Sequence, residues 1–383
     1  MATNAVIEVI SFWFMSQVPL NDLSRISEND INRFTESVHK ILESGIYLKG
    51  PFTKELELQL SIAFEGRKVV AVGNGTDALT IAISSLDLPK ESLIATCPNA
   101  GGYAGIAARQ AGCRTVLVDI DLETAQMSSE SLEEVIDSVP NIKAVVVTHL
   151  YGLCGDVTRI AEICTEKNIL LIEDCAQSFG AFVNGRPAGV FGDIAILSFY
   201  PTKNLGGIGD GGAIVCKSLD LAQRVSQISQ YGWGDKYRIQ SLGGMNSRID
   251  EIQAAFLLIQ LEKVSSQNMT RREITQIYIS NISGNRRIIS APDETFVGHL
   301  AVMVVTDRKR DQRMLESNGV QTGIHYPLLD SEQPAWFSRT SDGYTPELKN
   351  AIQLNSQILT IPCFPTMTSA EIQQVSSALQ VLE

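Results

Sequence analysis

The chain has 383 residues, with 31 Lys and Arg against 43 Asp and Glu, which gives a formal net charge of −12. This length can bury a sizeable core and favours two domains. Its 44% hydrophobic residues argue against long disordered segments. Broad binding to nucleic acids or anionic membranes is excluded, because the chain has no excess of cations to neutralise phosphates. A local pocket for one phosphorylated ligand remains possible.

The N-terminal stretch from Val6 to Met15 is apolar but short, and Glu8 interrupts it. It lacks the basic start of a signal peptide, and a membrane span needs roughly 20 apolar residues. We predict an arm over residues 1–22 that packs on the body or on a partner subunit. The 7 cysteines include no C-x-x-C pair. They favour buried free thiols in a reducing cytoplasm over disulfides, and we expect no metal site.

Short β-branched runs alternate with helical stretches from about residue 67 onward. The expected helices among them are Asp77–Ser85, Ser129–Ser138 and Val157–Lys167. This alternation predicts an α/β domain with a mostly parallel sheet covered on both faces. The expected strands are Val69–Val72, Leu93–Cys97, Thr115–Asp119, Ala144–Thr148, Ile169–Asp174, Ile194–Phe199 and Ala213–Cys216.

The pattern changes near Arg248. Apolar residues recur at helical spacing from Asp250 to Val264, which predicts one long helix. Mixed helical and extended segments follow up to Glu383. We therefore expect a large domain over residues 23–260 and a smaller α+β domain over residues 261–383.

A glycine-rich loop, GNGTDA (73–78), follows an expected strand and opens an expected helix. Glycines let the backbone approach a ligand, and free N–H groups at a helix start favour a phosphate. The spacing also fits the dinucleotide pattern G-x-G-x-x-G/A, but the next strand ends TCPN (96–99), without an acid to hold a ribose. A second match, GIGDGG (207–212), leads into a strand. Both glycine-rich segments therefore lack the context of a dinucleotide site, and either could be a plain tight turn.

Three polar side chains follow neighbouring strands. Asp174 ends a buried-type strand, and Ser198 and Lys203 come off the next apolar strand. In α/β sheets ligands gather at the carboxyl ends of strands, so these residues can converge with the glycine-rich loop. A lysine, an aspartate and a phosphate cradle are what pyridoxal phosphate (PLP) needs. The lysine reacts with the aldehyde, and the aspartate keeps the ring nitrogen protonated so that the ring accepts electrons.

These features together make the chain resemble the DegT-type nucleotide-sugar aminotransferases, which are PLP-dependent enzymes of the aspartate aminotransferase fold (fold type I). The resemblance runs from about Val18 to the C-terminus and implies a large PLP-binding domain with a mostly parallel seven-stranded sheet, a smaller α+β C-terminal domain and a cytoplasmic homodimer. It rests on GIYLKGP (45–51), residues 73–79, HLYG (149–152), EDCAQ (173–177), SFYPTKN (198–204), GDGG (209–212), NSRIDEIQAA (246–255) and HYP (325–327).

The resemblance assigns the central chemistry to three residues. Lys203 matches the family's Schiff-base lysine, which also moves the proton between the substrate carbon and the cofactor. Asp174 matches the partner of the pyridine nitrogen, and Gln177 matches the residue beside the phenolic oxygen. The simpler readings are a solvated lysine, a strand-end cap and a helix-surface glutamine.

The phosphate of the cofactor is assigned to a second group of residues. Ser198 and the backbone of Gly75, Thr76 and Asp77 would hold it. Asn246 is expected to reach in from a second subunit. A site shared in this way implies a homodimer, the commonest closed assembly.

Two positions depart from the family pattern. Many relatives place an aromatic ring over the pyridine soon after the strand that ends near Cys97, where simple register puts a glycine here. Tyr103 is the nearest ring, and two preceding glycines could bring it into place; the alternative is a tyrosine of the core. Phe179 stands where many relatives carry histidine, and its meaning stays open.

Substrate contacts are expected mainly from the second domain. His325 and Tyr326 match a sugar-nucleotide contact motif, against a packed loop before a proline. Tyr231 and Arg248 are weaker candidates; Arg248 could grip a diphosphate or only pair with acids. His149 either lies near the cofactor or simply ends its strand.

The resemblance implies reversible transamination. An amino acid, by resemblance glutamate, gives its amine to a dTDP- or UDP-linked 3-keto- or 4-keto-6-deoxyhexose, and the product is an amino sugar for a surface polysaccharide such as O-antigen or for a glycosylated natural product. The family's sugar 3-dehydratases carry histidine at the lysine position, so Lys203 argues against that alternative. Cyclitol or aromatic-precursor amination and a non-catalytic PLP-fold regulator stay open.

Overall fold

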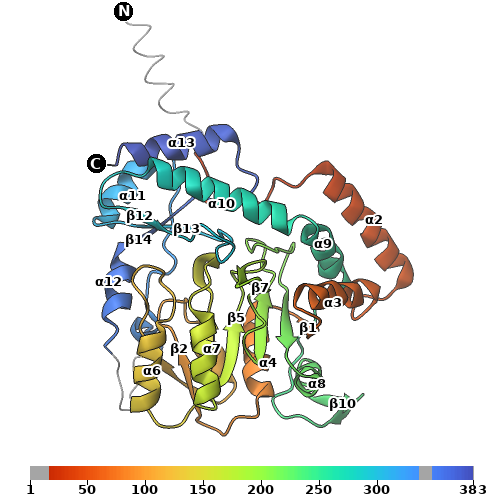
Figure 1. Ribbon diagram of the computed structural model, residues 1–383. Coiled ribbons are helices and arrows are strands. Elements are labelled where there is room, and N and C mark those ends of the chain that lie inside the picture. Colours follow the sequence, from red (N-terminus) through yellow and green to blue (C-terminus); the bar gives the residue numbers. More distant parts are fainter. Residues whose placement is uncertain (1–16, 336–346, 383) are drawn as a thin grey trace, which may run out of the picture.

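The computed structural model describes residues 17–335 and 347–382 (Figure 1), so the apolar stretch from Val6 to Met15 lies outside the described residues. A seven-stranded sheet forms the centre, in the order β1-β9-β8-β5-β4-β2-β3. Its strands are β1 (Lys68–Val72), β2 (Leu93–Thr96), β3 (Arg114–Leu117), β4 (Ile142–Thr148), β5 (Leu170–Asp174), β8 (Ile194–Ser198) and β9 (Gly212–Cys216).

The strands of this sheet coincide with the seven runs expected from the sequence. Only β9 runs antiparallel to its two neighbours; the remaining pairs are parallel, which confirms a mostly parallel sheet. The glycine-rich loop joins β1 to a helix, and GIGDGG leads into β9, as predicted.

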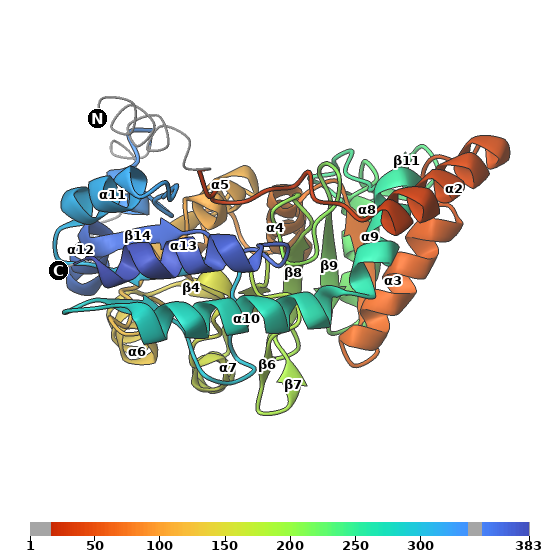
Figure 2. The same cartoon turned by 90° about the horizontal axis from the view of Figure 1, so that it is seen from above.

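Helices cover both faces of the sheet (Figure 2). α6 (Ser129–Ser138) and α7 (Val157–Glu166) lie on one face, and α4 (Gly75–Ser85), α5 (Tyr103–Gln110) and α8 (Leu219–Ile228) lie on the other. Successive strand residues point to opposite faces, so Ile194 and Ile196 join one apolar core while Ala195 and Leu197 join the other. Both faces are therefore buried, which explains the continuous apolar runs.

The second part of the chain builds a small antiparallel sheet in the order β12-β13-β14. Val18 joins the core beneath it and forms a bridge with Val320, so residues 17–22 pack beside this sheet. The domain boundaries at residues 22/23 and 260/261 stay a prediction. The elements are α10 (Val264–Asn281), β12 (Arg287–Ile289), β13 (Ala301–Val304), α11 (Arg308–Ser317), α12 (Lys349–Gln357), β14 (Ile358–Ile361) and α13 (Ser369–Gln380).

The single long helix predicted from Asp250 to Val264 is wrong. α9 (Glu251–Leu261) ends before a short turn, and α10 starts a new helix at Val264. The turn residues Glu262 and Lys263 form ion pairs with α2 (Glu28–Ser44), through Arg33 and Asp30. Val264, the first residue of α10, keeps the apolar spacing of α9 across the turn, so periodicity alone could not reveal it.

Smaller elements complete the described chain: α3 (Pro51–Ala63), the hairpin strands β6 (Phe182–Val183) and β7 (Arg186–Pro187), the hairpin strands β10 (Trp233–Asp235) and β11 (Arg238–Ile239), and the short 3-10 helices η1 (Leu150–Gly152) and η2 (Asp330–Glu332). Within the described ranges, no helix is long and apolar enough to span a bilayer. All 7 cysteines are buried and free, as expected from the sequence.

Candidate active site

A cavity of about 530 Å³ opens where β4, β5 and β8 end. Its walls come from the glycine-rich loop, the start of α5, the loop after β8 and two segments that follow α10. Most of the residues expected at the cofactor and substrate meet here. They are Gly75, Thr76, Tyr103, Asp174, Gln177, Ser198, Lys203, His325 and Tyr326.

The start of α4 forms one end of the cavity. Asn74 caps this helix by accepting a hydrogen bond from the Asp77 N–H at 2.8 Å. The N–H groups of Gly75 and Thr76 belong to the first turn, where a helix offers no acceptor. A Cβ on Gly75 would lie 2.7 Å from the Ser198 Cβ, so glycine lets the helix start approach the serine. This end of the cavity suits a phosphate. The Asp77 N–H, which was expected to bind the phosphate, donates to the Asn74 cap instead.

Asp174 and Lys203 supply opposite charges deeper in the cavity. Asp174 accepts hydrogen bonds from the Ala176 N–H at 3.0 Å and from the Thr148 hydroxyl at 3.3 Å. Burial nevertheless raises the pKa of Asp174, against the Ala176 N–H and the charge of Lys203. Burial lowers the pKa of Lys203 to about 8, while the Asp174 charge acts in the other direction. Part of the Lys203 amine is thus neutral and nucleophilic near physiological pH. A cation placed near Asp174 would stabilise its carboxylate.

Gln177 is held on both ends of its side-chain amide. Its Oε1 accepts a hydrogen bond from the Tyr151 N–H at 2.7 Å, and its Nε2 donates to the Tyr326 hydroxyl at 3.1 Å. The Tyr151 hydroxyl donates to the His325 carbonyl at 2.6 Å. These bonds tie the large sheet to the segment around Tyr326, which closes the cavity.

Tyr103 begins α5 at the cavity wall. Gly101 and Gly102 precede it with φ of +77° and +82°, a conformation that favours glycine. The Tyr103 ring lies 6.1 Å from that of Tyr326 in a T-shaped arrangement, and the side chain is 44% exposed, which does not fit a core tyrosine. Stacking on a cofactor ring stays a prediction. Phe179, in contrast, is buried.

Asp77 does not line the cavity, and three further expected residues, Asn246, Arg248 and Tyr231, lie outside it in their own chain. Arg248 contacts the Asn246 side-chain oxygen, lies 3.4 Å from the Tyr231 hydroxyl, and covers the Tyr231 ring. This group lies beside the hairpin β10–β11, where the Tyr231 ring packs against Trp233 at 4.7 Å, and the adjacent Ser247 hydroxyl accepts a hydrogen bond from the Gly73 N–H at 2.9 Å. A role of Asn246 in the site of a second subunit stays a prediction.

His149 is fully buried behind the cavity. Its Nε2 lies 3.2 Å from a carboxylate oxygen of Glu173, and Cys175 lies close enough to complete a group with metal-ligand atoms. Glu173 already accepts three backbone N–H groups, a set that secures its charge without an ion. We read this group as structural support for β5, and not as a contact to a ligand.

His299 also lines the cavity, although no sequence pattern selected it. Its Nδ1 lies 2.9 Å from the Asn204 side-chain oxygen. Burial, together with the charges of Lys203 and Arg271, lowers the pKa of His299 well below its usual value, so the ring is neutral. Its only signal was a place directly after the apolar run FVG (296–298).

The donor set of the cavity fits PLP. A helix start with free N–H groups and a serine suits the phosphate, Lys203 suits the aldehyde, and the buried Asp174 suits a protonated ring nitrogen.

Comparison with known proteins agrees with this assignment of PLP. The model of the DegT/DnrJ/EryC1/StrS aminotransferase family matches residues 28–380. A "dTDP-3-amino-3,6-dideoxy-alpha-D-galactopyranose transaminase" of Aneurinibacillus thermoaerophilus is 34% identical, over 94% of this chain and 98% of the relative. The crystal structure of S. venezuelae DesV in complex with a ketimine intermediate has a TM-score of 0.90 and 30% identity, covering 96% of this chain and 98% of that one. The Bacillus subtilis NtdA structure with bound PMP has a TM-score of 0.89 and 28% identity, over 95% and 85% of the two chains.

Proposed function

We propose, from the premise that this chain belongs to the DegT/DnrJ/EryC1/StrS aminotransferase family, that it transfers an amino group from glutamate to a nucleotide-linked keto-6-deoxyhexose. Membership confirms the predicted resemblance, the fold class, the aminotransferase activity and PLP as the cofactor. The observation that carries the proposal is the meeting of Lys203, Asp174 and the α4 start in one cavity.

When bound, PLP supplies an electron sink for the carbon that loses or gains a proton. Asp174 holds a proton at the ring nitrogen, because its buried carboxylate is stabilised by a cation. Lys203 would hold the cofactor through its amine, and the same amine would move a proton at the reacting carbon. The lowered pKa of about 8 keeps part of this amine unprotonated at neutral pH, as a base requires.

The remaining residues orient the reactants. The N–H groups of Gly75 and Thr76 and the Ser198 hydroxyl anchor the phosphate. Gln177 is fixed by two hydrogen bonds and would lie beside the phenolic oxygen of the cofactor, as the family resemblance implies. His325 and Tyr326 close the cavity on the substrate side, where they contact the sugar nucleotide.

The acceptor is a dTDP- or UDP-linked sugar aminated at C3 or C4. The relative from A. thermoaerophilus carries a dTDP-3-amino sugar in its name, which favours C3. Lys203 disfavours the dehydratase alternative. The complete donor set around it disfavours a non-catalytic regulator.

The assembly we propose is a homodimer with shared sites, working in the cytoplasm on a sugar for a surface polysaccharide or natural product. Exposed apolar residues on one side of the molecule support an interface. They include Leu42 at 59%, Leu58 at 53%, Ile62 at 64% and Leu242 at 93% exposed. Buried free thiols are compatible with a reducing compartment.

One experiment tests the activity and the substrate together. Purified protein, reconstituted with PLP, is given glutamate and a panel of dTDP- and UDP-linked 3-keto and 4-keto sugars, and products are detected by mass. We expect one amino sugar from wild type and none from Lys203→Ala. Failure of wild type to bind PLP would contradict the central assignment, and amination of only a cyclitol or small aromatic ketone would move the substrate to those branches.

A further inference from the structure

A second cavity of about 550 Å³ lies on the other side of the loop that carries Lys203. The loop from Pro201 to Ile208 forms one wall, and the turn between α9 and α10 forms another. Lys203 borders both cavities, whereas Arg271 borders only this one. The space is large enough for a small organic ligand.

Arg271 is a buried cation without a counter-ion. The residue is 5% exposed, and its Nε and Nη1 atoms have no hydrogen-bond partner among the described residues. Burial lowers its pKa to about 10, and the only nearby group that acts in the other direction is the Cys363 thiol. The guanidinium is therefore still charged at neutral pH. A buried charge with unpaired donors is costly, so a site that retains one calls for an anion.

Other charged side chains around the cavity are already paired. Arg25 forms ion pairs with Asp22 and Glu371, and Lys263 pairs with Asp30. These pairs leave the Arg271 charge as the one that a ligand can neutralise in this part of the described chain, since Lys203 serves the cofactor cavity.

The rest of the lining is mixed in character. Gln267 lies one helical turn before Arg271 on α10, so both side chains share a face, and no hydrogen bond of the Gln267 amide is recorded among the described residues. Phe256 and Phe364 contribute apolar surface. This combination suits a ligand with a carbon chain and a charged end.

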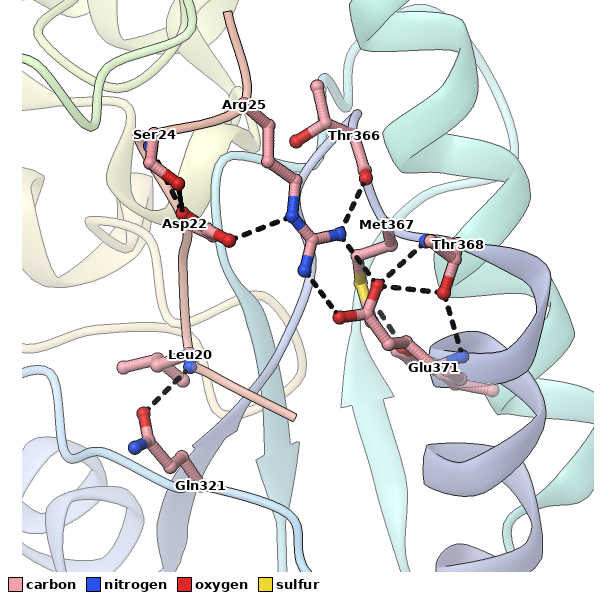
Figure 3. Close-up of polar contacts among 10 residues, drawn as sticks. Leu20, Asp22, Ser24, Arg25, Gln321, Thr366, Met367, Thr368 and Glu371 are labelled. Carbon is pink, nitrogen blue, oxygen red and sulfur yellow. Dashed lines mark hydrogen bonds and ion pairs between the residues drawn. The ribbon is translucent and has the colours of Figure 1, made fainter. Parts of the chain in front are cut away.

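The N-terminal segment forms the outer wall, and it is fastened in place. Figure 3 shows Arg25 joined to Asp22, to the Thr366 carbonyl at 2.9 Å and to both carboxylate oxygens of Glu371. Nearer the start of the segment, the Leu20 N–H donates to the Gln321 side-chain oxygen at 3.1 Å. The wall is thus part of the folded body, and the cavity beneath it is enclosed by two parts of the chain far apart in sequence.

We propose that this second cavity binds a small aliphatic carboxylate, whose carboxylate group accepts hydrogen bonds from the Arg271 guanidinium. The planar fork of arginine matches a carboxylate with two parallel bonds. One unpaired positive charge balances one carboxylate, and the apolar wall takes the carbon chain. The site lies outside the cofactor cavity and goes beyond the transamination proposed above. The loop that carries Lys203 forms one wall of this second cavity, so a ligand bound there would contact that loop.

The test is calorimetric titration of the PLP-loaded protein with pentanoate, which has one carboxylate and no amino or keto group to react. Wild type should bind pentanoate, and its melting temperature should rise with pentanoate concentration. Arg271→Gln should bind about ten- to a hundredfold more weakly, the effect of losing a charged hydrogen-bond donor. Titration requires no turnover, so the result does not depend on the sugar acceptor.

The matched control is Arg272→Gln, which removes the same charge one residue along the helix, away from this cavity. It should bind like wild type. Equal binding by wild type and Arg271→Gln would overturn the proposal, because pentanoate would then occupy another site, and so would absence of binding by wild type. Inorganic phosphate at matched ionic strength serves as the second probe; binding as tight as that of pentanoate would overturn the carboxylate class.

A second variant keeps the test decisive where Arg271→Gln does not fold. Arg271→Lys keeps the charge but loses the planar fork, so pentanoate should bind several-fold more weakly. Unchanged binding by Arg271→Lys together with unchanged binding by Gln267→Leu would overturn the proposal.

Discussion

Two opposing effects act on the amine of Lys203. Removal from water disfavours its charged form, and the neighbouring Asp174 carboxylate favours it. Burial has the larger effect, so the pKa falls from 10.5 to about 8. Asp174 experiences the reverse, because burial raises its pKa. The pair is prepared for a cofactor that brings its own cationic ring nitrogen.

This balance predicts the pH dependence of PLP capture by the cofactor-free protein. Only the neutral amine attacks an aldehyde, so the capture rate should rise with pH and level off above about 8. Stopped-flow absorbance measures it. In Asp174→Asn the carboxylate no longer raises the lysine pKa, so the midpoint should move to lower pH. A wild-type midpoint near the ordinary lysine value would contradict the assigned environment.

Gly75 permits a second prediction at a single residue. Alanine is normally the better helix former, by about 1 kcal/mol. At this position its Cβ would lie 2.7 Å from the Ser198 Cβ and 2.9 Å from its hydroxyl oxygen. Gly75→Ala should therefore weaken PLP binding at least about tenfold, as expected for the loss of a charge-assisted hydrogen bond. Equilibrium dialysis measures the affinity.

The control combines Gly75→Ala with Ser198→Gly, which removes the atoms that clash. Ser198→Gly alone gives the cost of losing the hydroxyl. The double variant should bind PLP about as well as Ser198→Gly. A double variant weaker than both single variants would show that the crowding against Ser198 is not the cause.

Residues at strand ends were predictable from the sequence, and residues placed by tertiary contacts were not. Asp174, Ser198 and Lys203 follow strands whose carboxyl ends meet at one edge of the sheet, so their convergence followed from topology. His299 and Arg271 reach their cavities only because segments after α9 fold back over that edge. No local pattern records such a return of the chain.

At the scale of elements, one carboxylate joins two helices. Glu251, in the first turn of α9, is fully buried and caps the start of α3. It accepts hydrogen bonds at 2.9 Å from the N–H groups of Gly50, Phe52 and Thr53. Within the motif 246–255, only Asn246 and Arg248 were expected at the cofactor and the substrate, whereas Glu251 holds the α3–α9 contact.

Removing this carboxylate should destabilise the fold. Glu251→Ala leaves three N–H groups of the α3 start without their acceptor, and we expect a loss of about 3 kcal/mol in the free energy of unfolding. Urea denaturation followed by circular dichroism measures it. Glu262→Ala, at the exposed end of the same helix, is the matched control and should cost less than about 1 kcal/mol. Equal losses in both variants would contradict the capping role.

The break between α9 and α10 shows a limit of periodicity. Hydrophobic spacing continues through the turn, whereas the direction of the chain changes at Glu262 and Lys263. The two charged residues pair with α2, an element more than two hundred positions earlier. Partners that distant determine where a helix ends, and a single-segment pattern does not contain them.

At the scale of the whole molecule, the surface around α2 and α3 is unusual for a chain with a net charge of −12. Leu42, Leu58 and Ile62 are more than half exposed there. The hairpin β10–β11 and its following loop add Tyr237 at 76% and Leu242 at 93% exposed. Clustered exposed apolar side chains indicate an interface, and the same loop leads to Asn246, which lies outside its own cavity.

Sharing of the site between subunits can be tested by mixing variants. Lys203→Ala lacks the amine, and Asn246→Glu puts a carboxylate against the expected phosphate, so each should lose at least about a hundredfold in activity. After exchange of subunits about half of the dimers are heterodimers, and each has one site with both native residues, so about a quarter of wild-type activity should return. The double variant mixed with wild type is the control, because its heterodimers contain no intact site. Activity no greater than the sum of the two separate variants would place Lys203 and Asn246 of one chain in the same site and exclude the shared arrangement.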